Sequence, residues 1–355
     1  MVKVLHTSDL HLKKYQGERW NTLVDLIELG NKEEITHFVI SGDLFDKNFE
    51  ANKLRPKIRE VFSKGSFDVI LLSGNHDHSA YKQKFDFGDN VQVLSEDKKV
   101  INYEEVDIYG LPFKEISNEK ILDELRSLDK IVDSKKTNIL LYHGELLDSF
   151  FSKGEFGDEG KKRYMPVKLS YFKDLNFNYI LAGHFHTNFD SREIDQDTHF
   201  VYPGSPVSIT KKETGKRKVN IFKKGEAPQP KKLKTPYFKE INIILSYKDE
   251  NPLEKIKKEL SNVEENAKVL FKVGGFIDSE KINKTEKEFI NEIRKVAKEK
   301  CYEYQEPTIK DISEVLNSDL FINFEKKLKE ENYSKEKEKE LINLLIKGMT
   351  EIEQT

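Results

Sequence analysis

The distribution of hydrophobic residues over the first 222 positions is typical of a layered α/β domain. Six short runs are rich in β-branched, aromatic or other apolar side chains, and each ends near Gly, Ser, Asn or Asp, as buried strands do. Amphipathic helical patterns lie at 19–29, 52–63 and 118–132, whereas 91–113 resembles a β-meander. This alternation predicts a mixed sheet core flanked by helices. The predicted strands are 2–6, 37–40, 69–72, 138–142, 179–182 and 200–202.

The pattern changes after residue 222. The stretch 223–236 (KKGEAPQPKKLKTP) contains three prolines and five lysines without periodicity, which predicts a linker. A compact β-α-β-α-β pattern over 237–310 then predicts a small α+β domain. Residues 311–355 are purely helical in pattern, with two highly charged amphipathic helices at 319–331 and 335–353. The chain therefore divides into four parts, at 1–222, 223–236, 237–310 and 311–355.

Composition narrows the functional classes. The chain has 355 residues, of which 35% are charged and 37% hydrophobic, and no stretch reaches the roughly 18 apolar residues of a membrane span. Its start runs straight into a predicted strand without a secretory signal, so we expect a cytoplasmic protein. A single cysteine, Cys301, excludes an intramolecular disulfide and thiolate metal clusters. The net charge of −3 excludes a uniformly basic nucleic-acid coat protein but permits a local basic patch.

Metal-binding residue types gather directly after the predicted strands. Five of the nine histidines lie in five short motifs at these strand ends, where open α/β sheets place their ligands. Imidazole nitrogens with carboxylate or amide oxygens suit divalent transition metals. Asp-x-His and His-x-His also place two donors on one side of an extended segment. The motifs are Asp9-Leu10-His11, Gly42-Asp43, Gly74-Asn75-His76-Asp77, Tyr142-His143-Gly144 and Gly183-His184-Phe185-His186.

Each motif taken alone also has a purely structural explanation. Asp9-x-His11 and Gly42-Asp43 could be turns, Asn75 and Asp77 could cap helices, and His143 could be a satisfied semi-buried side chain. Their occurrence together, in order, at successive strand ends favours a site instead. Two metals a few ångström apart need a bridging carboxylate, and Asp43 is the natural candidate.

The five motifs together resemble the signature of the calcineurin-like metallophosphoesterases, over about residues 1–222. The resemblance implies a layered sandwich of mixed β-sheets flanked by helices, a hydrolase activity on phosphoesters, and two divalent cations. One implied cation site consists of Asp9, His11, Asp43 and His186, and the other of Asp43, Asn75, His143 and His184.

The same resemblance implies catalytic roles for His76 and Asp77. The histidine of the G-N-H-D motif is not a metal ligand in this family but faces the scissile phosphate. A histidine there can stabilise developing charge and protonate the leaving alkoxide. Asp77 is expected to orient His76 by a hydrogen bond.

Three further segments resemble the SbcD nuclease family, the bacterial counterpart of the Mre-eleven double-strand-break repair nuclease. They are residues 6–11 (HTSDLH), 42–47 (GDLFDK) and 202–206 (YPGSP). The second segment lacks the arginine of the phosphatase motif G-D-x-V-D-R-G. Many members of the wider nuclease family have histidine where this chain has Asp46, and SbcD-type members commonly have aspartate.

The resemblance to SbcD implies an activity and a set of partners. It implies a manganese-dependent exonuclease and endonuclease at DNA ends, associated with the nucleoid and commonly dimeric through early helices. Residues 237–310 would be the capping domain that frames DNA. Residues 311–355 would be the helical pair that docks on an SbcC-type coiled-coil ATPase, the Rad-fifty counterpart.

A basic run gives candidate DNA contacts. Residues 210–234 contain ten basic residues against Glu213 and Glu226, a net charge of +8 that could neutralise backbone phosphates. Lysines also solvate linkers and protect edge strands, which is the competing explanation. The Pro-Gly-Ser turn could bind phosphate or simply end a strand. The candidate DNA-binding residues are Lys211, Lys212, Lys216, Arg217, Lys218 and Ser205.

The last two helices carry apolar stripes at helical spacing, which either form a core or bind a partner helix. The candidate partner-binding residues are Leu320, Phe321, Phe324, Leu328, Leu341 and Leu345. Two other functions remain open beside the nuclease: a stand-alone phosphodiesterase acting on small nucleotides, and a phosphoesterase-like scaffold that only binds a partner. Loss of several ligands would favour the scaffold, and here all of them are present.

Overall fold

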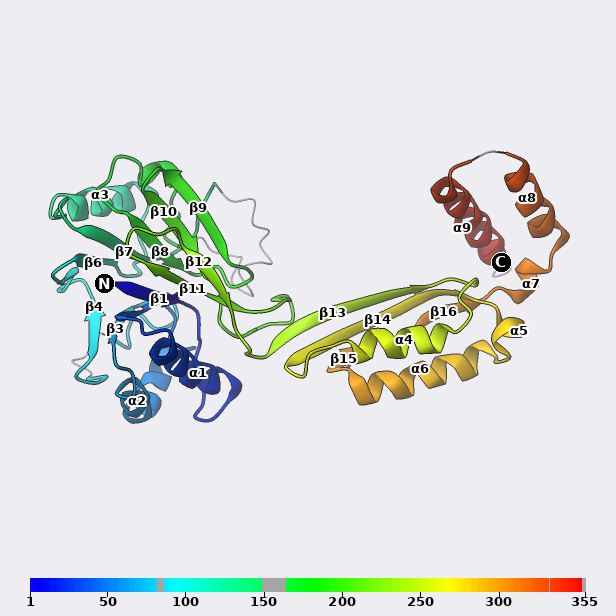
Figure 1. The fold of residues 1–355 in the computed structure, drawn as a ribbon, viewed down its shortest axis with the longest axis horizontal. Helices are drawn as coiled ribbons and strands as arrows, with labels where there is room; N and C mark the ends of the chain where they lie inside the picture. Colours follow the sequence, from blue (N-terminus) through cyan, green and yellow to red (C-terminus); the bar gives the residue numbers. More distant parts are fainter. Residues whose placement is uncertain (82–85, 149–163, 332, 353–355) are drawn as a thin grey trace. The chain divides into compact units, whose positions relative to one another are not determined.

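The computed structural model describes residues 1–81, 86–148, 164–331 and 333–352. The chain forms two compact units, Met1–Phe238 and Lys239–Thr355. The first unit is a sandwich of two sheets, and the second combines a smaller sheet with helices (Figure 1). No helix in the described part of the chain is long and apolar enough to cross a membrane.

The first sheet has the strand order β12-β11-β1-β2-β3-β4. Strands β1 to β4 run parallel, β11 is antiparallel to β1, and β12 is antiparallel to β11. Helices α1 (Glu18–Lys32) and α2 (Asn48–Phe62) bury their apolar faces against one side of this sheet. The strands are β1 (Lys3–Thr7), β2 (His37–Ser41), β3 (Asp68–Leu72), β4 (Val91–Leu94), β11 (Lys218–Lys223) and β12 (Gln229–Lys232).

The second sheet has the order β5-β6-β7-β8-β10-β9 and packs face to face on the first. Because both inner faces consist mainly of Val, Ile and Leu, with Tyr179 and Phe222 among them, the interface between the sheets forms a continuous apolar core. Helix α3 (Asn118–Asp129) and the short helix η2 (Leu169–Tyr171) lie on its outer side. The strands are β5 (Val100–Asn102), β6 (Val106–Leu111), β7 (Thr137–His143), β8 (Tyr179–Gly183), β9 (Asp190–Asp195) and β10 (Thr198–Tyr202).

The fold class expected from the sequence is confirmed, and the six predicted strands correspond to β1, β2, β3, β7, β8 and β10. Two expectations were wrong. The stretch 91–113 is not a meander, because β4 pairs with β3 in the first sheet while β5 and β6 belong to the second. The stretch 223–236 is not a linker, because it contains β12, whose lysines face solvent on an edge strand.

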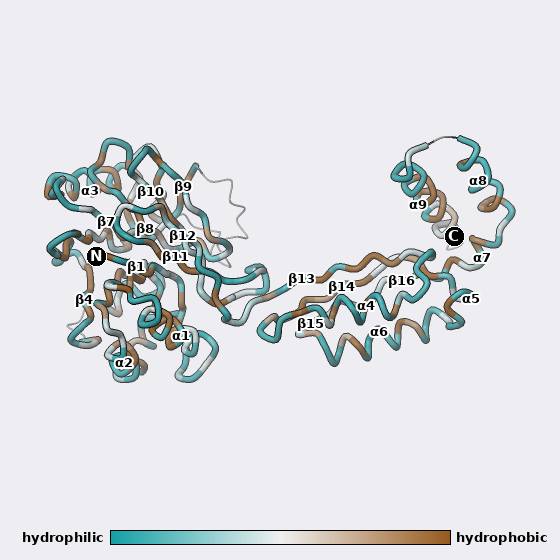
Figure 2. Tube along the Cα trace, viewed as in Figure 1, coloured by the Kyte–Doolittle hydropathy of each residue, from teal (hydrophilic) through white to brown (hydrophobic). Residues whose placement is uncertain are grey.

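The second unit is built on a sheet in which β13, β15 and β16 all pair with the long strand β14. Helices α4 and α6 cover one face of this sheet, and the strands β13 and β14 are largely hydrophobic (Figure 2). The elements are β13 (Tyr237–Leu245), α4 (Pro252–Ser261), β14 (Ala267–Ile277), α5 (Ser279–Ile282), α6 (Glu286–Lys300), β15 (Glu303–Tyr304), β16 (Thr308–Asp311), α7 (Ser313–Leu316), α8 (Asp319–Glu330) and α9 (Lys335–Ile352).

The two terminal helices, α8 and α9, form a small core of their own that also receives Tyr247 and Phe276 from the sheet region of the same unit. This corrects part of the expected partner surface, because Phe321 and Leu328 are buried inside that core. Phe324, Leu341 and Leu345 are partly buried against it. Leu320 remains 59% exposed, together with Ile322 at 53% and Leu344 at 59%.

Candidate metal centre

The loops after β1 and β2 run side by side and hold three acidic or imidazole side chains in strained backbone conformations. The amide of Asp9 donates to the carbonyl of Gly42 at 3.1 Å, and that of His11 donates to the carbonyl of Asp43 at 2.9 Å. Asp9, His11 and Asp43 have φ angles of 56°, 47° and 52°, in the left-handed region that non-glycine residues rarely adopt. Such strain persists where surrounding structure enforces it, and it gathers at functional sites.

Two glycines allow the motifs to approach one another. A Cβ atom at Gly42 would lie 2.0 Å from Nδ1 of His143, and one at Gly74 would lie 2.2 Å from Oδ1 of Asp43. Both distances are shorter than any real contact, so any side chain there would push the histidine or the aspartate away. The Gly that precedes Asp43 and the Gly that precedes Asn75 are therefore required by close packing.

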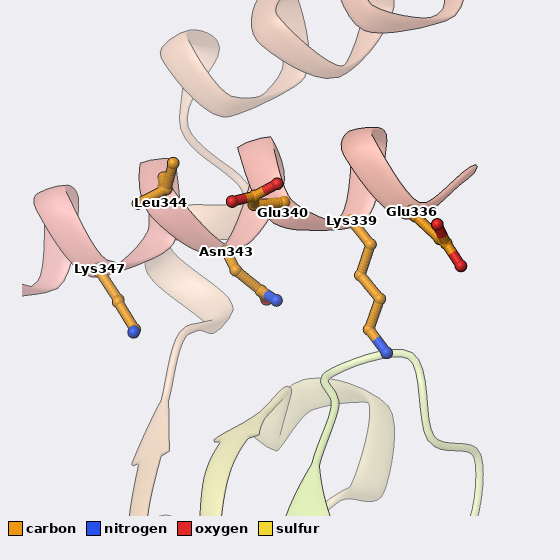
Figure 3. A pocket seen from close by; sticks show the side chains of 6 residues that line it. All are labelled: Glu336, Lys339, Glu340, Asn343, Leu344 and Lys347. Atoms are coloured by element: carbon orange, nitrogen blue, oxygen red, sulfur yellow. The ribbon is translucent and has the colours of Figure 1, made fainter. Parts of the chain in front are cut away.

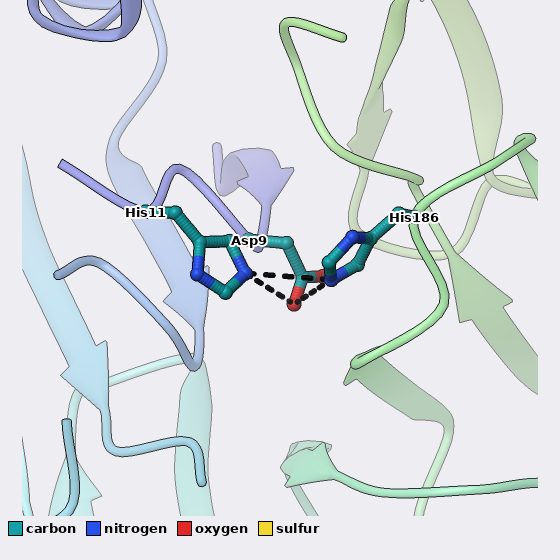
Figure 4. Close-up of side chains that lie close together, drawn as sticks. All are labelled: Asp9, His11 and His186. Carbon is teal, nitrogen blue, oxygen red and sulfur yellow. Dashed lines mark hydrogen bonds and ion pairs between the residues drawn. The ribbon is translucent and has the colours of Figure 1, made fainter. Parts of the chain in front are cut away.

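The seven residues expected as ligands meet at the ends of strands from both sheets, and we call them the strand-end cluster. Nε2 of His186 lies 3.4 Å from Oδ1 of Asp9 and 3.4 Å from Nε2 of His11. Figure 4 shows these three side chains converging on one point. Nε2 of His11 also lies 3.6 Å from Oδ2 of Asp43, which connects the two halves of the cluster. The strand-end cluster comprises Asp9, His11, Asp43, Asn75, His143, His184 and His186.

His143 occupies the other half of the strand-end cluster. Its Nδ1 donates to the carbonyl of Ser41 at 2.8 Å, which leaves Nε2 facing Oδ2 of Asp43 at 3.3 Å and Oδ1 of Asn75 at 3.0 Å. Because a carbonyl can only accept, this contact fixes the orientation in which Nε2 can bind a cation. The His184 ring lies 5.4 Å from the His143 ring, and its backbone amide donates to the Asp9 carboxylate.

The electrostatics of the strand-end cluster favour cations. Burial alone would raise the carboxyl pKa values of Asp9 and Asp43, but neighbouring imidazoles hold both well below their usual range. Burial also opposes protonation of His143, yet the Asp43 carboxylate raises its pKa to about 9. Burial lowers the pKa of His11 to about 3, so this side chain is a neutral donor. The strand-end cluster thus attracts positive charge, and a divalent cation can replace the bound protons.

The donor set fits the two divalent cations that the sequence implies. Among the described residues, three sets of three side chains have ligand atoms within 4.8 Å of one another, and both Asp9 and Asp43 recur in two of them. Nitrogen and carboxylate donors without thiolates suit manganese, iron or zinc. The sets are Asp9, His11 and His186; His11, Asp43 and His76; and Asp9, Asp43 and His143.

Residues 2–188, more than half of the chain, match the sequence model of the calcineurin-like phosphoesterase family. The chain belongs to this family. Its buried aspartates and histidines are compatible with the two-metal site of a metallophosphoesterase.

Two archaeal relatives are similar to this phosphoesterase over a longer range. The DNA double-strand break repair protein Mre11 of Sulfurisphaera tokodaii is 26% identical over 271 residues, which are 69% of this chain and 65% of the relative. The protein of the same name from Sulfolobus acidocaldarius is 23% identical over 52% of this chain and 50% of its own length. The chain thus spans between half and two thirds of the length of these curated relatives.

Two solved structures resemble this phosphoesterase at low sequence identity. The protein TT1561 of Thermus thermophilus covers 61% of this chain and 93% of its own, with 12% identity and a TM-score of 0.39. A dimetal phosphatase from Danio rerio covers 62% of this chain and 91% of its own, with 11% identity and a TM-score of 0.42. At TM-scores below 0.5, neither resemblance bears on the substrate.

His76 lies beside the strand-end cluster of the phosphoesterase, but Asp77 does not orient it as expected. Nδ1 of His76 donates to the backbone carbonyl of Asp46 at 2.9 Å, and the two rings of His11 and His76 are 4.7 Å apart. Asp77 instead accepts hydrogen bonds from the amides of Gly74 at 2.8 Å and Phe45 at 3.1 Å. The buried Asp77 carboxylate points back into the protein because those two amides need an acceptor there.

Asp46 therefore positions His76 with its backbone rather than its side chain. Its carboxylate accepts from the Arg19 guanidinium at 3.0 Å and lies 3.2 Å from the Lys13 ammonium. The carboxylate is thus neutralised by two cations, which explains how an acidic residue is tolerated next to a site for phosphoesters.

The structure adds Glu213 to the residues around the strand-end cluster. In the sequence it stood out only as one of two acidic residues in the basic run 210–234. Its carboxylate is fully buried and lies 3.4 Å from Nδ1 of His186, the nitrogen opposite the one that faces Asp9. It also accepts from the amide of Ile209 at 2.7 Å. Contact with His186 lowers the pKa of Glu213 to about 2, against the effect of burial. A carboxylate on the far nitrogen is the usual partner of a metal-binding histidine.

Two expected DNA contacts, Ser205 and Arg217, are also buried behind His186. The Arg217 guanidinium donates to the carbonyls of Ser205 at 2.9 Å, Thr187 at 2.8 Å and His186, and the Ser205 hydroxyl donates to Glu213 at 3.0 Å. Because these groups complete the hydrogen bonds of the loop that carries His186, they are not offered to DNA. Lys211, Lys212 and Lys216 remain exposed, and Lys218 is half-buried.

Proposed function

We propose that the chain is a two-metal, manganese-dependent DNA nuclease that hydrolyses phosphodiester bonds at DNA ends, as exonuclease and endonuclease, in double-strand-break repair. The observation that carries this proposal is the convergence of the seven side chains of the strand-end cluster, in a chain similar to archaeal Mre11 proteins. A stand-alone phosphodiesterase on small nucleotides is the second candidate, because the same cluster would serve it equally.

We assign the seven side chains of the strand-end cluster as cation ligands, with Asp43 between the two positions. Divalent cations at such a site activate water and neutralise charge on a phosphoester. The chain itself contributes His76, whose ring is held by the Asp46 carbonyl at 2.9 Å with the other nitrogen directed away from that contact. His76 can then donate a proton to the leaving alkoxide. Asp77 fixes the loop that carries His76 by binding the amides of Gly74 and Phe45.

For the partners, we propose DNA, an SbcC-type coiled-coil ATPase and a second copy of this chain. The exposed lysines 211, 212 and 216 can neutralise backbone phosphates. The helical pair offers Leu320, Ile322 and Leu344, which are more than half exposed, to a partner helix. On α9, Glu336, Lys339, Glu340, Asn343, Leu344 and Lys347 line a hollow of about 420 Å³ (Figure 3). For the homodimer, α2 presents Phe49, which is 52% exposed.

The test is cleavage of short single-stranded and duplex DNA by the full chain, with and without Mn²⁺, beside cyclic nucleotides and p-nitrophenyl phosphate. We expect manganese-dependent DNA cleavage, and Asp43→Ala should lower it more than about 1,000-fold together with metal content. Asp123→Ala, an exposed aspartate on α3, is the matched control and should keep both. Hydrolysis of nucleotides without cleavage of DNA would support the second candidate instead.

A further inference from the structure

A groove that the proposed chemistry does not use opens beside the strand-end cluster. Its volume is about 630 Å³, within the roughly 300–1,000 Å³ that small-molecule sites occupy. The loop after β3 contributes His78 and Tyr81, and the segment after β6 contributes Phe113 and Lys114. The groove is thus lined by aromatic rings drawn from both sheets of the first unit.

The residues that line the groove adjoin the strand-end cluster. His78 Nδ1 contacts the carbonyl of Asn75 at 3.3 Å, so the groove begins at the loop that also carries His76. A series of rings then links the groove to the cluster: His78 lies 5.8 Å from Phe113, Phe113 lies 5.8 Å from Tyr164, and Tyr164 lies 5.2 Å from His184. A phosphate bound at the cluster would therefore have these aromatic side chains close to it.

The charge of the groove is wrong for phosphate but suits a neutral aromatic ring. Glu96, Asp97 and Glu115 are exposed on its rim, and the Lys114 ammonium is paired with Glu124 at 2.8 Å. The carboxylates repel a phosphodiester backbone but can accept hydrogen bonds from the amino groups of a nucleobase. Aromatic side chains stack on bases irrespective of sequence.

We propose that this groove binds the base of the nucleotide whose phosphate is hydrolysed at the strand-end cluster, an inference that rests on the proposed nuclease function. Because the acidic rim disfavours a second phosphate beyond that base, the groove accommodates a terminal nucleotide. His78 and Phe113 supply the stacking surfaces. The groove therefore selects strand ends over internal positions.

The direct test is equilibrium binding to the full chain, by calorimetry, of deoxyadenosine 5′-monophosphate and of 2-deoxyribose 5-phosphate, which lacks the base. We expect the nucleotide to bind about ten-fold more tightly or better, the range that one stacked base gives. His78→Ala and the ring-removing Phe113→Leu should each bring that ratio close to one. His199→Ala, a histidine of β10 outside the groove, should leave the ratio unchanged.

A second measurement separates this inference from the nuclease proposal. Oligonucleotides with an abasic terminal nucleotide should be cleaved with about ten-fold lower kcat/KM than intact ones. Equal binding of the two small probes by the wild-type chain would contradict the proposal that the groove binds the base. A ratio of affinities that persists in both groove variants would contradict it as well. If no DNA is cleaved but the preference for the nucleotide remains, the nuclease proposal fails and the groove stands.

Discussion

The strand-end cluster and the C-terminal helical pair depart from the ordinary distribution of side chains in opposite ways. In the strand-end cluster, Asp9, Asp43 and His143 are polar and completely buried. In the helical pair, Leu320 and Leu344 are apolar and 59% exposed. Buried polar groups are costly without partners, and exposed apolar groups that gather on one surface often mark an interaction site. The first departure points to a ligand inside the protein, and the second to a partner outside it.

The comparison also shows how differently the two regions are held. The strand-end cluster is fixed by strained backbone at Asp9, His11 and Asp43. The Ser41 carbonyl lies behind the ring of His143, and the Glu213 carboxylate lies behind the ring of His186. The helical pair rests on a small core around Phe321 and Ile346. We therefore expect substitutions in the cluster to change chemistry, and substitutions on the outer face of the helices to change association alone.

Among the variants that test this comparison, His76→Ala should have the largest effect on DNA cleavage. His76→Ala should lower DNA cleavage about 100-fold or more while the full chain keeps its manganese, because the ring is assigned to the leaving group. Metal analysis and cleavage rates on the same preparation check this, with His199→Ala as the control. Loss of manganese would show that His76 acts as a metal ligand. This is the alternative outcome, because His76 forms one of the three potential metal-binding sets with His11 and Asp43.

Glu213→Gln should have the next largest effect, on metal affinity. The amide keeps the size of the side chain but replaces the carboxylate that faces Nδ1 of His186 at 3.4 Å. We expect manganese to bind about 10- to 100-fold more weakly, measured by titration into metal-free protein. Glu193→Gln, on the exposed part of β9, is the control. An unchanged affinity would reduce Glu213 to a purely structural acceptor for the amides of Ile209 and Thr210.

The helical pair provides a contrast within one element. Leu344→Glu should leave the melting temperature of the isolated chain unchanged and weaken binding of the proposed ATPase partner about ten-fold or more, because Leu344 is 59% exposed. Ile346→Glu should instead lower the melting temperature by more than about 5 °C, since a buried charge costs several kcal/mol. If Leu344→Glu destabilises the chain yet still co-purifies with the ATPase, the docking proposal loses its support.

The smallest effect concerns the exposed edge of the first sheet. Lys231 on β12 and Lys3 on β1 hydrogen-bond to Glu33 at 2.7 and 3.1 Å and hold the pKa of its carboxyl below its usual value. Glu33→Gln should lower the free energy of unfolding at pH 7 by at most about 1 kcal/mol. The difference should shrink as the pH falls below the unfolded carboxyl pKa of about 4.3 and disappear below the lowered folded pKa, because a depressed pKa stabilises only while the folded carboxylate stays ionised. Melting curves at pH 7 and 3.5, with Glu104→Gln as the control, test this.

Local sequence could predict where the candidate ligands gather, because each motif lies at the end of a strand whose pattern is strong. Asp9, Asp43 and His143 come directly after short apolar runs, and parallel strands end at a common edge. The pattern therefore determined both the sheets and the place where their polar ends meet. Most of the first unit and the five motifs at the strand ends were accessible in this way, whereas the choice of seven ligands among them came from the resemblance to the phosphoesterases.

What the sequence could not give depends on long-range contacts of single side chains. Glu213 and Arg217 stand in a run of lysines that looks like a solvent-exposed surface, and only the return of the chain behind His186 buries them. Asp77 was expected to orient His76, but two backbone amides compete for its carboxylate. Strand β12 was missed because an edge strand can carry prolines and lysines.

The strand-end cluster also has a consequence for how the chain folds. The Asp9 carboxylate accepts from the amide of His184, 175 residues further along the chain. Such contacts close only after both sheets have formed, and contacts of high sequence separation are slow to form. The catalytic centre should therefore be among the last features to appear during refolding. Recovery of activity should lag behind recovery of secondary structure, and a fragment that lacks β8 should have no residual activity.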